Sequence, residues 1–104
     1  MDEKTINFTS DTTNSISENK ISNFKLYPNP TNSNFTIEYF LQSPEDVLFK
    51  MYNSQGQELE DKLIKSNVGE NKFDVSLEDY SKGIYFYNII TEQGYSEIGY
   101  VVKQ

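Results

Sequence analysis

Apolar and polar residues alternate along the chain from Phe24 onward, and this period of two predicts β-strands. The run 35–41 shows it clearly, with Phe40 as the one exception to the alternation. The segment 84–91 is instead dense in β-branched and aromatic residues, as expected of a central strand that is covered on both faces. Strands are predicted at residues 25–27, 35–41, 47–52, 57–65, 72–77, 84–91 and 95–103.

Residues that favour turns separate these runs at intervals of roughly ten residues. Gly56 is expected to adopt positive φ in the turn 53–56, and Gly83 is expected to do so where a short irregular crossing over 77–82 ends. Further turns are predicted at 68–70 and 92–94. The sequence therefore predicts an all-β fold, a seven-stranded antiparallel two-sheet Ig-like sandwich, with a small open barrel as the alternative.

Residues 1–23 have a different composition, since they are almost all charged, Asn, Ser or Thr. Their sizeable apolar residues are too few and too scattered to offset the entropy of ordering the segment. We interpret 1–23 as a flexible polar linker or tail and 24–104 as the folded domain. A first strand over Thr5–Thr9 is the alternative for part of this segment.

Composition and charge narrow the classes of function. The 104 residues suffice for one domain, which we expect to be a monomer, and no segment is apolar enough to span a membrane. A net charge of −7 disfavours binding to nucleic acid. The absence of Cys and His removes the commonest nucleophile, general base and metal ligands. We expect no catalytic activity, no metal and no cofactor.

Two groups of side chains could still carry chemistry. The acidic residues Glu58 and Glu60 are expected to share one face of a strand, where they could act as paired carboxylates or simply solubilise the surface. Four tyrosines on the last two strands could form a sugar-binding platform or pack against one another across the strands. They are Tyr85, Tyr87, Tyr95 and Tyr100.

The segment Leu26-Tyr27-Pro28-Asn29-Pro30-Thr31 is the strongest local signal. Its two prolines fix their own φ angles and push the residues before them toward extended geometry. The segment is therefore expected to be a stiff, extended entry into the first hairpin.

The stretch 24–104 resembles the type A C-terminal sorting domain of the type IX (Por) secretion system of Bacteroidota. The match runs in order along the chain, and one of its stretches is Gly69-x-Asn71 with Phe73 and Val75, which fits a strand of the family. Eleven residues from the other four stretches are here called the sorting-motif residues. They are Tyr27, Pro28, Asn29 and Pro30, then Asn53 and Gly56, then Gly83 and Tyr85, and last Val101, Val102 and Lys103. One departure is that Gly99-Tyr100 stands where the family usually carries a Lys.

The resemblance implies a delivery signal and no catalyst. It implies a cargo protein fused at the N-terminus, recognition by the type IX outer-membrane translocon, and removal of the domain by a surface sortase-like peptidase. Cleavage would fall within about residues 10–24, and the cargo would be secreted or displayed on the cell surface. The alternative function is a non-catalytic carbohydrate-binding or adhesive Ig-like module.

Overall fold

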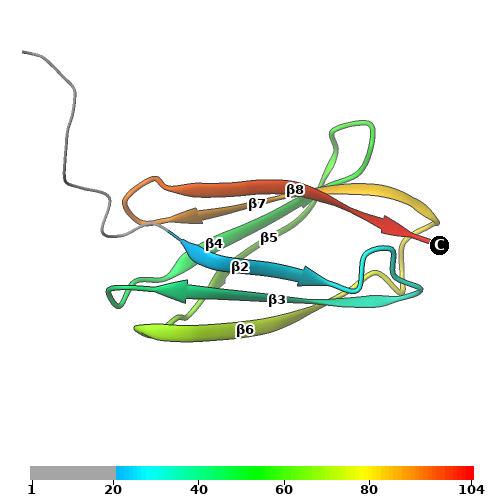
Figure 1. The fold of residues 1–104 in the computed structure, drawn as a ribbon. Coiled ribbons are helices and arrows are strands. Elements are labelled where there is room, and N and C mark those ends of the chain that lie inside the picture. Colours follow the sequence, from blue (N-terminus) through cyan, green and yellow to red (C-terminus); the bar gives the residue numbers. More distant parts are fainter. Residues whose placement is uncertain (1–20) are drawn as a thin grey trace, which may run out of the picture.

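Seven strands form in the computed structural model of the protein, which describes residues 21–104. Each predicted strand is present, and all pairings between strands are antiparallel, so the predicted fold class is confirmed (Figure 1). The strands are β2 (Ser22–Tyr27), β3 (Asn34–Leu41), β4 (Val47–Tyr52), β5 (Glu58–Ile64), β6 (Gly69–Ser76), β7 (Gly83–Thr91) and β8 (Ser96–Lys103). The turn predicted at 68–70 is wrong for its last two residues, because β6 already begins at Gly69.

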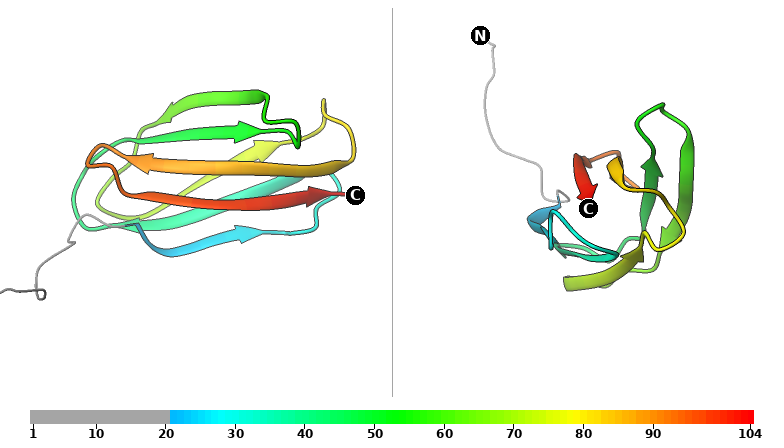
Figure 2. Two further views of the ribbon diagram at one scale, coloured as in Figure 1. Left: turned by 90° about the horizontal axis from the view of Figure 1, so that it is seen from above. Right: turned by 90° about the vertical axis from the view of Figure 1, so that its right-hand side faces the viewer.

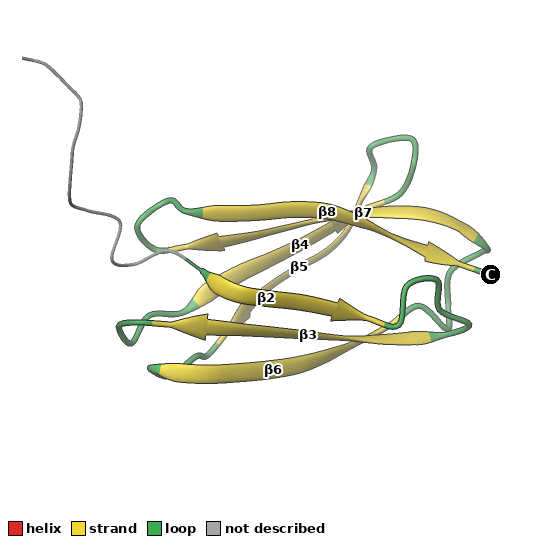
Figure 3. Ribbon diagram, viewed as in Figure 1, coloured by secondary structure: helices red, strands yellow, loops and turns green. Residues whose placement is uncertain are grey.

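The strands form two separate sheets, which makes the fold a sandwich and not an open barrel. One sheet has the order β2-β3-β6 and the other β5-β4-β7-β8. Figure 2 shows the two sheets from above and from the end, and Figure 3 shows only strands and loops in residues 21–104. No helix in this part of the chain could cross a membrane.

The core lies between the sheets and is built from the inward residues of the predicted alternation. Phe49 is fully buried and meets the Phe73 ring edge-on, with the ring centroids 5.4 Å apart. Each such side chain contributes about 1.5–3 kcal/mol when fully buried. The core residues are Phe35, Ile37, Tyr39, Leu41, Val47, Phe49, Met51, Val75, Leu77, Tyr85, Tyr87, Ile89 and Val101.

The first strand is longer than the sequence predicted, because β2 begins at Ser22 and not at Lys25. Ile21, placed in the linker by sequence, packs against the core. A β-bulge follows Ser22, where Asn23 has a φ of +51°, a region that Asn tolerates better than most residues. Residues 21–23 of the linker predicted over 1–23 thus belong to the fold. The rest of that linker and the alternative strand at 5–9 lie outside the described residues.

A second bulge, between β4 and β5, overturns the prediction that Glu58 and Glu60 share a face. Glu60 is opposite Met51, whereas Glu58 is opposite Tyr52, so Leu59 is the extra residue. Because neighbouring residues of β4 point to opposite faces, the two carboxylates do so as well. Glu58 lies 3.5 Å from the ammonium of Lys50 on the outer face, so the pair of acids does not form.

The edge strands β2 and β8 run in the same direction on one side of the sandwich (Figure 1). No Cα atom of β2 comes within 8 Å of one in β8, so the two sheets do not join along these strands. The rings of Phe24 and Tyr87 stack across this side, with centroids 5.7 Å apart. The end of the Tyr87 ring lies over Gly99, at the place where a Cβ atom would otherwise be.

Candidate functional site

The sorting-motif residues all lie at one end of the sandwich, here called the motif end. β2, β4 and β8 end there, and β3, β5 and β7 begin there. In Figure 1 this is the end that carries the label C. The antiparallel topology therefore brings together four of the matching stretches, which are spread over more than seventy residues of sequence. The stretch Gly69-x-Asn71 lies at the opposite end, where β6 begins opposite Leu41.

The Asn29 side chain connects the first motif to the last. Its amide nitrogen donates a hydrogen bond to the Tyr100 carbonyl at 3.0 Å, and its amide oxygen accepts one from the Val102 N–H at 3.0 Å. These are the two kinds of bond that a neighbouring strand would make along the edge of β8. The Asn29 carboxamide therefore takes the place of a strand backbone at this edge.

Thr31 extends the same contact with its own backbone. Its N–H donates to the Val102 carbonyl at 2.8 Å, and its carbonyl accepts from the Gln104 N–H at 2.8 Å. This forms a short parallel bridge between Thr31 and Lys103. We call residues 29–31 and 100–104, with their four hydrogen bonds, the clasp.

Thr31 was missed by sequence reasoning, although it is among the few buried polar residues of the described chain. Its hydroxyl donates to the Asn34 carbonyl and accepts from the Ser33 N–H at 3.2 Å. Burial of a Thr after Pro30 leaves no periodic signal, because the segment is neither strand nor helix.

Lys103 fixes the end of β8 on its other side. Its ammonium donates to the carbonyl oxygens of Leu77 and Tyr80, at 2.7 and 2.6 Å. Both carbonyls belong to the irregular crossing predicted over 77–82, where the Tyr80 N–H closes a turn onto Leu77 at 3.0 Å. Charge-assisted bonds to two carbonyls hold β8 against this turn.

Asn53 has a local role in the turn between β4 and β5. Its side-chain oxygen accepts from the N–H groups of Gln55 and Gln57, each at 3.0 Å. Gly56 has a φ of +85° and donates its N–H to the Asn53 carbonyl at 3.0 Å. The positive φ expected for Gly56 is confirmed, as is that of Gly83 at +149°.

A hollow of about 320 Å³ lies beside this turn, between it and the crossing. Asn53, Gly83 and Tyr85 from the sorting motifs line it, together with Tyr80. Tyr85 is buried, and its hydroxyl donates a hydrogen bond to the Ser81 carbonyl. This bond ties the crossing to the core. Burial raises the pKa of Tyr80, and so does the hydrogen bond that its hydroxyl donates to Glu60 at 3.0 Å.

Tyr27, the first sorting-motif residue, is exposed on the outer face of the three-stranded sheet. Its hydroxyl donates to Glu38, and this bond raises the pKa of the tyrosine. The carboxylate of Glu38 on β3 therefore already accepts a hydrogen bond from Tyr27 on the adjacent strand β2.

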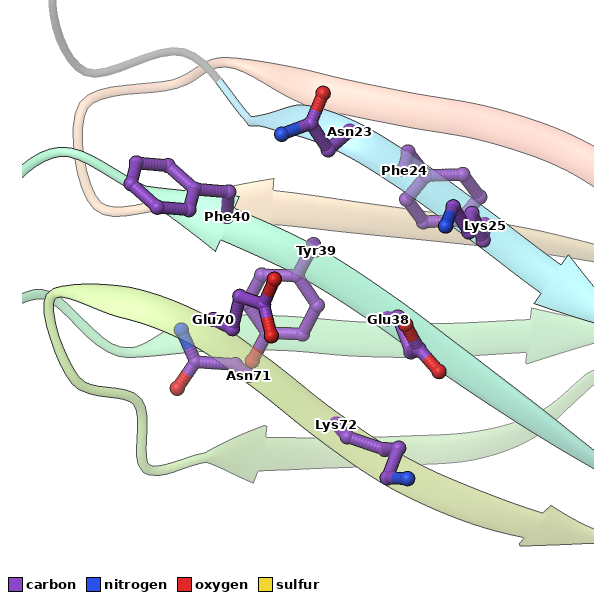
Figure 4. A pocket seen from close by; sticks show the side chains of 9 residues that line it. All are labelled: Asn23, Phe24, Lys25, Glu38, Tyr39, Phe40, Glu70, Asn71 and Lys72. Atoms are coloured by element: carbon purple, nitrogen blue, oxygen red, sulfur yellow. The ribbon is translucent and has the colours of Figure 1, made fainter.

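A larger hollow, of about 520 Å³, lies at the opposite end of the sandwich (Figure 4). It follows the bulge at Asn23 on the outer face of the three-stranded sheet, and its charged lining includes Lys25, Glu38 and Lys72. None of the eleven sorting-motif residues lines it, although Asn71 of the Gly69-x-Asn71 stretch does. This hollow is therefore not part of the motif end.

The sugar-binding platform considered for four tyrosines does not form. Tyr85 and Tyr87 point into the core, and Tyr95 is half-buried, which leaves Tyr100 as the exposed member. Within residues 21–104, no group of three acidic residues could hold a metal ion.

Comparison with known proteins identifies the family. The family model described as secretion system C-terminal sorting domain matches residues 25–104. A search of the curated proteins finds no match. Among the solved structures, a GH3 beta-glucosidase from Bifidobacterium adolescentis aligns with a TM-score of 0.45 and 11% identity. That alignment covers 81% of this chain and 17% of that enzyme, and it bears on no function. The family match spans the whole sandwich from Lys25 onward, and the chain belongs to the family of secretion system C-terminal sorting domains of the type IX system.

Proposed function

We propose that the motif end is the part of the domain that the type IX outer-membrane translocon reads, and that the domain thereby delivers a cargo protein fused to its N-terminus. Membership of the family makes the domain a signal for export toward the cell surface. The finer steps, which are recognition by the translocon and removal by a surface sortase-like peptidase, are our proposal.

The observation that carries this proposal is the clasp. Asn29, from the first motif, holds the backbone of Tyr100 and Val102, next to and within the last motif. A receptor that contacts this end would meet both motifs at once. The signal is then a folded surface and not a linear peptide, because neither part keeps its position without the other.

The peptidase is proposed to cut before β2. Proteases need an extended backbone that can leave the fold, and Ser22–Tyr27 is paired with β3. Of the range 10–24 that the resemblance suggests, residues 22–24 are therefore the least suitable for cleavage. We propose a cut on the N-terminal side of Ser22.

An export assay tests the proposal. The full chain is fused to the C-terminus of a fluorescent protein that carries a Sec signal peptide, in a host with a type IX system. We expect the fluorescent protein on the surface or in the medium, separated from the sandwich at a site before Ser22. Mass spectrometry of the exported protein locates the cut.

Point variants in the clasp make the assay specific. Asn29→Ala removes both side-chain bonds of the clasp and is expected to reduce export at least tenfold. Asn32→Ala is the matched control, since Asn32 is an exposed Asn of the same loop outside the clasp. Equal export of the two variants would contradict a role for the clasp, and retention of the unaltered fusion in the periplasm would contradict the proposed function itself.

A further inference from the structure

Large apolar side chains are exposed on the outer face of β7 and β8. Phe86 is directly opposite Tyr100 on the neighbouring strand. Ile98 is two residues before Tyr100 in β8, so it lies on the same face. We call the exposed residues of this face the apolar strip. They are Ile84, Phe86, Ile98 and Tyr100, with exposed fractions of 45, 43, 69 and 57%.

The outer face of the other sheet is more polar, although Tyr27 is 41% exposed there. Thr36 and Asp74 are hydrogen-bonded across it at 2.7 Å, and Tyr27 donates to Glu38 on the same face. A solvated sheet face normally carries such polar pairs. Four of the seven large apolar side chains that are exposed in residues 21–104 lie together in the apolar strip, whereas Tyr27, Leu63 and Val68 lie on other elements.

The edge of β8 next to the apolar strip is only half covered. Tyr100 and Val102 direct their backbone groups away from β7, since both bond to the clasp. In an antiparallel strand every second residue faces the same edge, so the N–H and C=O groups of Ile98 also point outward. Among the described residues, neither group has a backbone partner.

The strand β2 does not cover this edge. It lies more than 8 Å from β8 between Cα atoms, whereas paired strands are about 4.8 Å apart. The clasp covers residues 100–104 and stops there. An edge of a few residues, with exposed apolar side chains beside it, is a template for strand addition.

We propose that the open edge of β8 around Ile98, together with the apolar strip, binds an extended strand from a partner protein that the domain meets during export. This proposal rests on the proposed function, because export supplies the partner. The edge gives the added strand its backbone hydrogen bonds, and the apolar strip gives it a neighbour for its side chains.

The clasp and the charge of the chain indicate what this strand is like. The open part of the β8 edge runs from the start of the strand at Ser96 to the clasp at Tyr100. An added strand that lies along it therefore has room for about four or five residues before it meets Asn29. Its outward side chains meet Ile98 and Tyr100, which favours aromatic or β-branched residues. The net charge of −7 disfavours an acidic partner segment and favours a neutral or basic one.

Two variants separate the edge from the strip in the export assay. Ile98→Pro removes the outward N–H at a position where an edge strand tolerates proline, and Tyr100→Thr removes the ring while keeping a good strand former. Leu63→Thr is the matched control, because Leu63 is 58% exposed on β5, the opposite edge strand of the same sheet. Circular dichroism and the urea midpoint of each variant establish that it is folded.

We expect export to fall at least tenfold for Ile98→Pro and at least threefold for Tyr100→Thr, and to stay within twofold for Leu63→Thr. If Ile98→Pro does not fold, the export of Tyr100→Thr alone decides whether the inference holds. Normal export of the folded variants, while the unaltered fusion is exported, would overturn this inference and leave the proposed function standing. Failure of the unaltered fusion would overturn both.

Discussion

The contact between Gly99 and Tyr87 allows a sharp test of the packing at the edge of the sandwich. A Cβ atom at residue 99 would lie 2.3 Å from the Tyr87 hydroxyl oxygen and 2.7 Å from its Cζ atom. The ring cannot yield freely, because it is 7% exposed and stacks on Phe24. The substitution Gly99→Ala must therefore displace the ring.

The expected cost follows from what the displaced ring loses. The stack with Phe24 is worth about 0.5–1.5 kcal/mol, and part of the ring becomes exposed at about 25 cal/mol per Å². Alanine in a strand gains about 0.5–1 kcal/mol over glycine, which offsets some of this. We expect Gly99→Ala to lower the free energy of unfolding by about 1–3 kcal/mol, in the range of overpacked cores.

Urea unfolding of a double-mutant cycle measures the effect. In a Tyr87→Val background the ring is gone, so Gly99→Ala is expected to be neutral or to stabilise by up to about 1 kcal/mol. The coupling between the two positions is then about 2 kcal/mol. Equal effects of Gly99→Ala in the two backgrounds would refute this account of the glycine.

Three further predictions concern stability. Phe49→Ala should cost about 3–5 kcal/mol through the cavity it leaves, and an unmoved urea midpoint would show that Phe49 is not in the core. Lys103→Met should cost about 1–2 kcal/mol by removing two bonds to carbonyls, measured in the same way, and no loss would mean that the ammonium is not held there. Burial raises the pKa of Tyr39 and Tyr87 above the usual value of about 10. The two tyrosines should therefore contribute fully to the free energy of unfolding below about pH 10, and this contribution should be lost as the pH rises beyond it. Urea midpoints and tyrosinate absorbance across this range test the prediction, and a midpoint that rises with pH would contradict it.

Much of the fold follows from alternation alone. Runs such as 35–41 and 47–52 bury every second residue, so their faces could be assigned without knowing their partners. The glycines at 56 and 83 marked the turns correctly, since their positive φ is a local property. These features depend only on neighbouring residues, which the sequence displays directly.

Features that depend on pairing could not be predicted. A bulge adds one residue and reverses the faces beyond it, as Leu59 does for Glu58 and Glu60, and alternation cannot reveal it beforehand. The extension of β2 to Ser22 depends on Ile21 reaching the core, which its polar neighbours conceal. The clasp joins positions more than seventy residues apart, so the pattern around Asn29 indicated a stiff segment but not its partner.

The clasp also bears on the order of events during folding. The bonds from Asn29 span 71 and 73 positions, so they enclose nearly the whole domain and are among its least local contacts. Contacts of this kind form late, since the entropy of closing a long loop is offset only once the intervening strands have paired. A partly folded chain can hold many native strand pairs and still lack the clasp. The presence of the clasp is thus a mark of completed folding, and any factor that binds it distinguishes finished domains from unfinished ones.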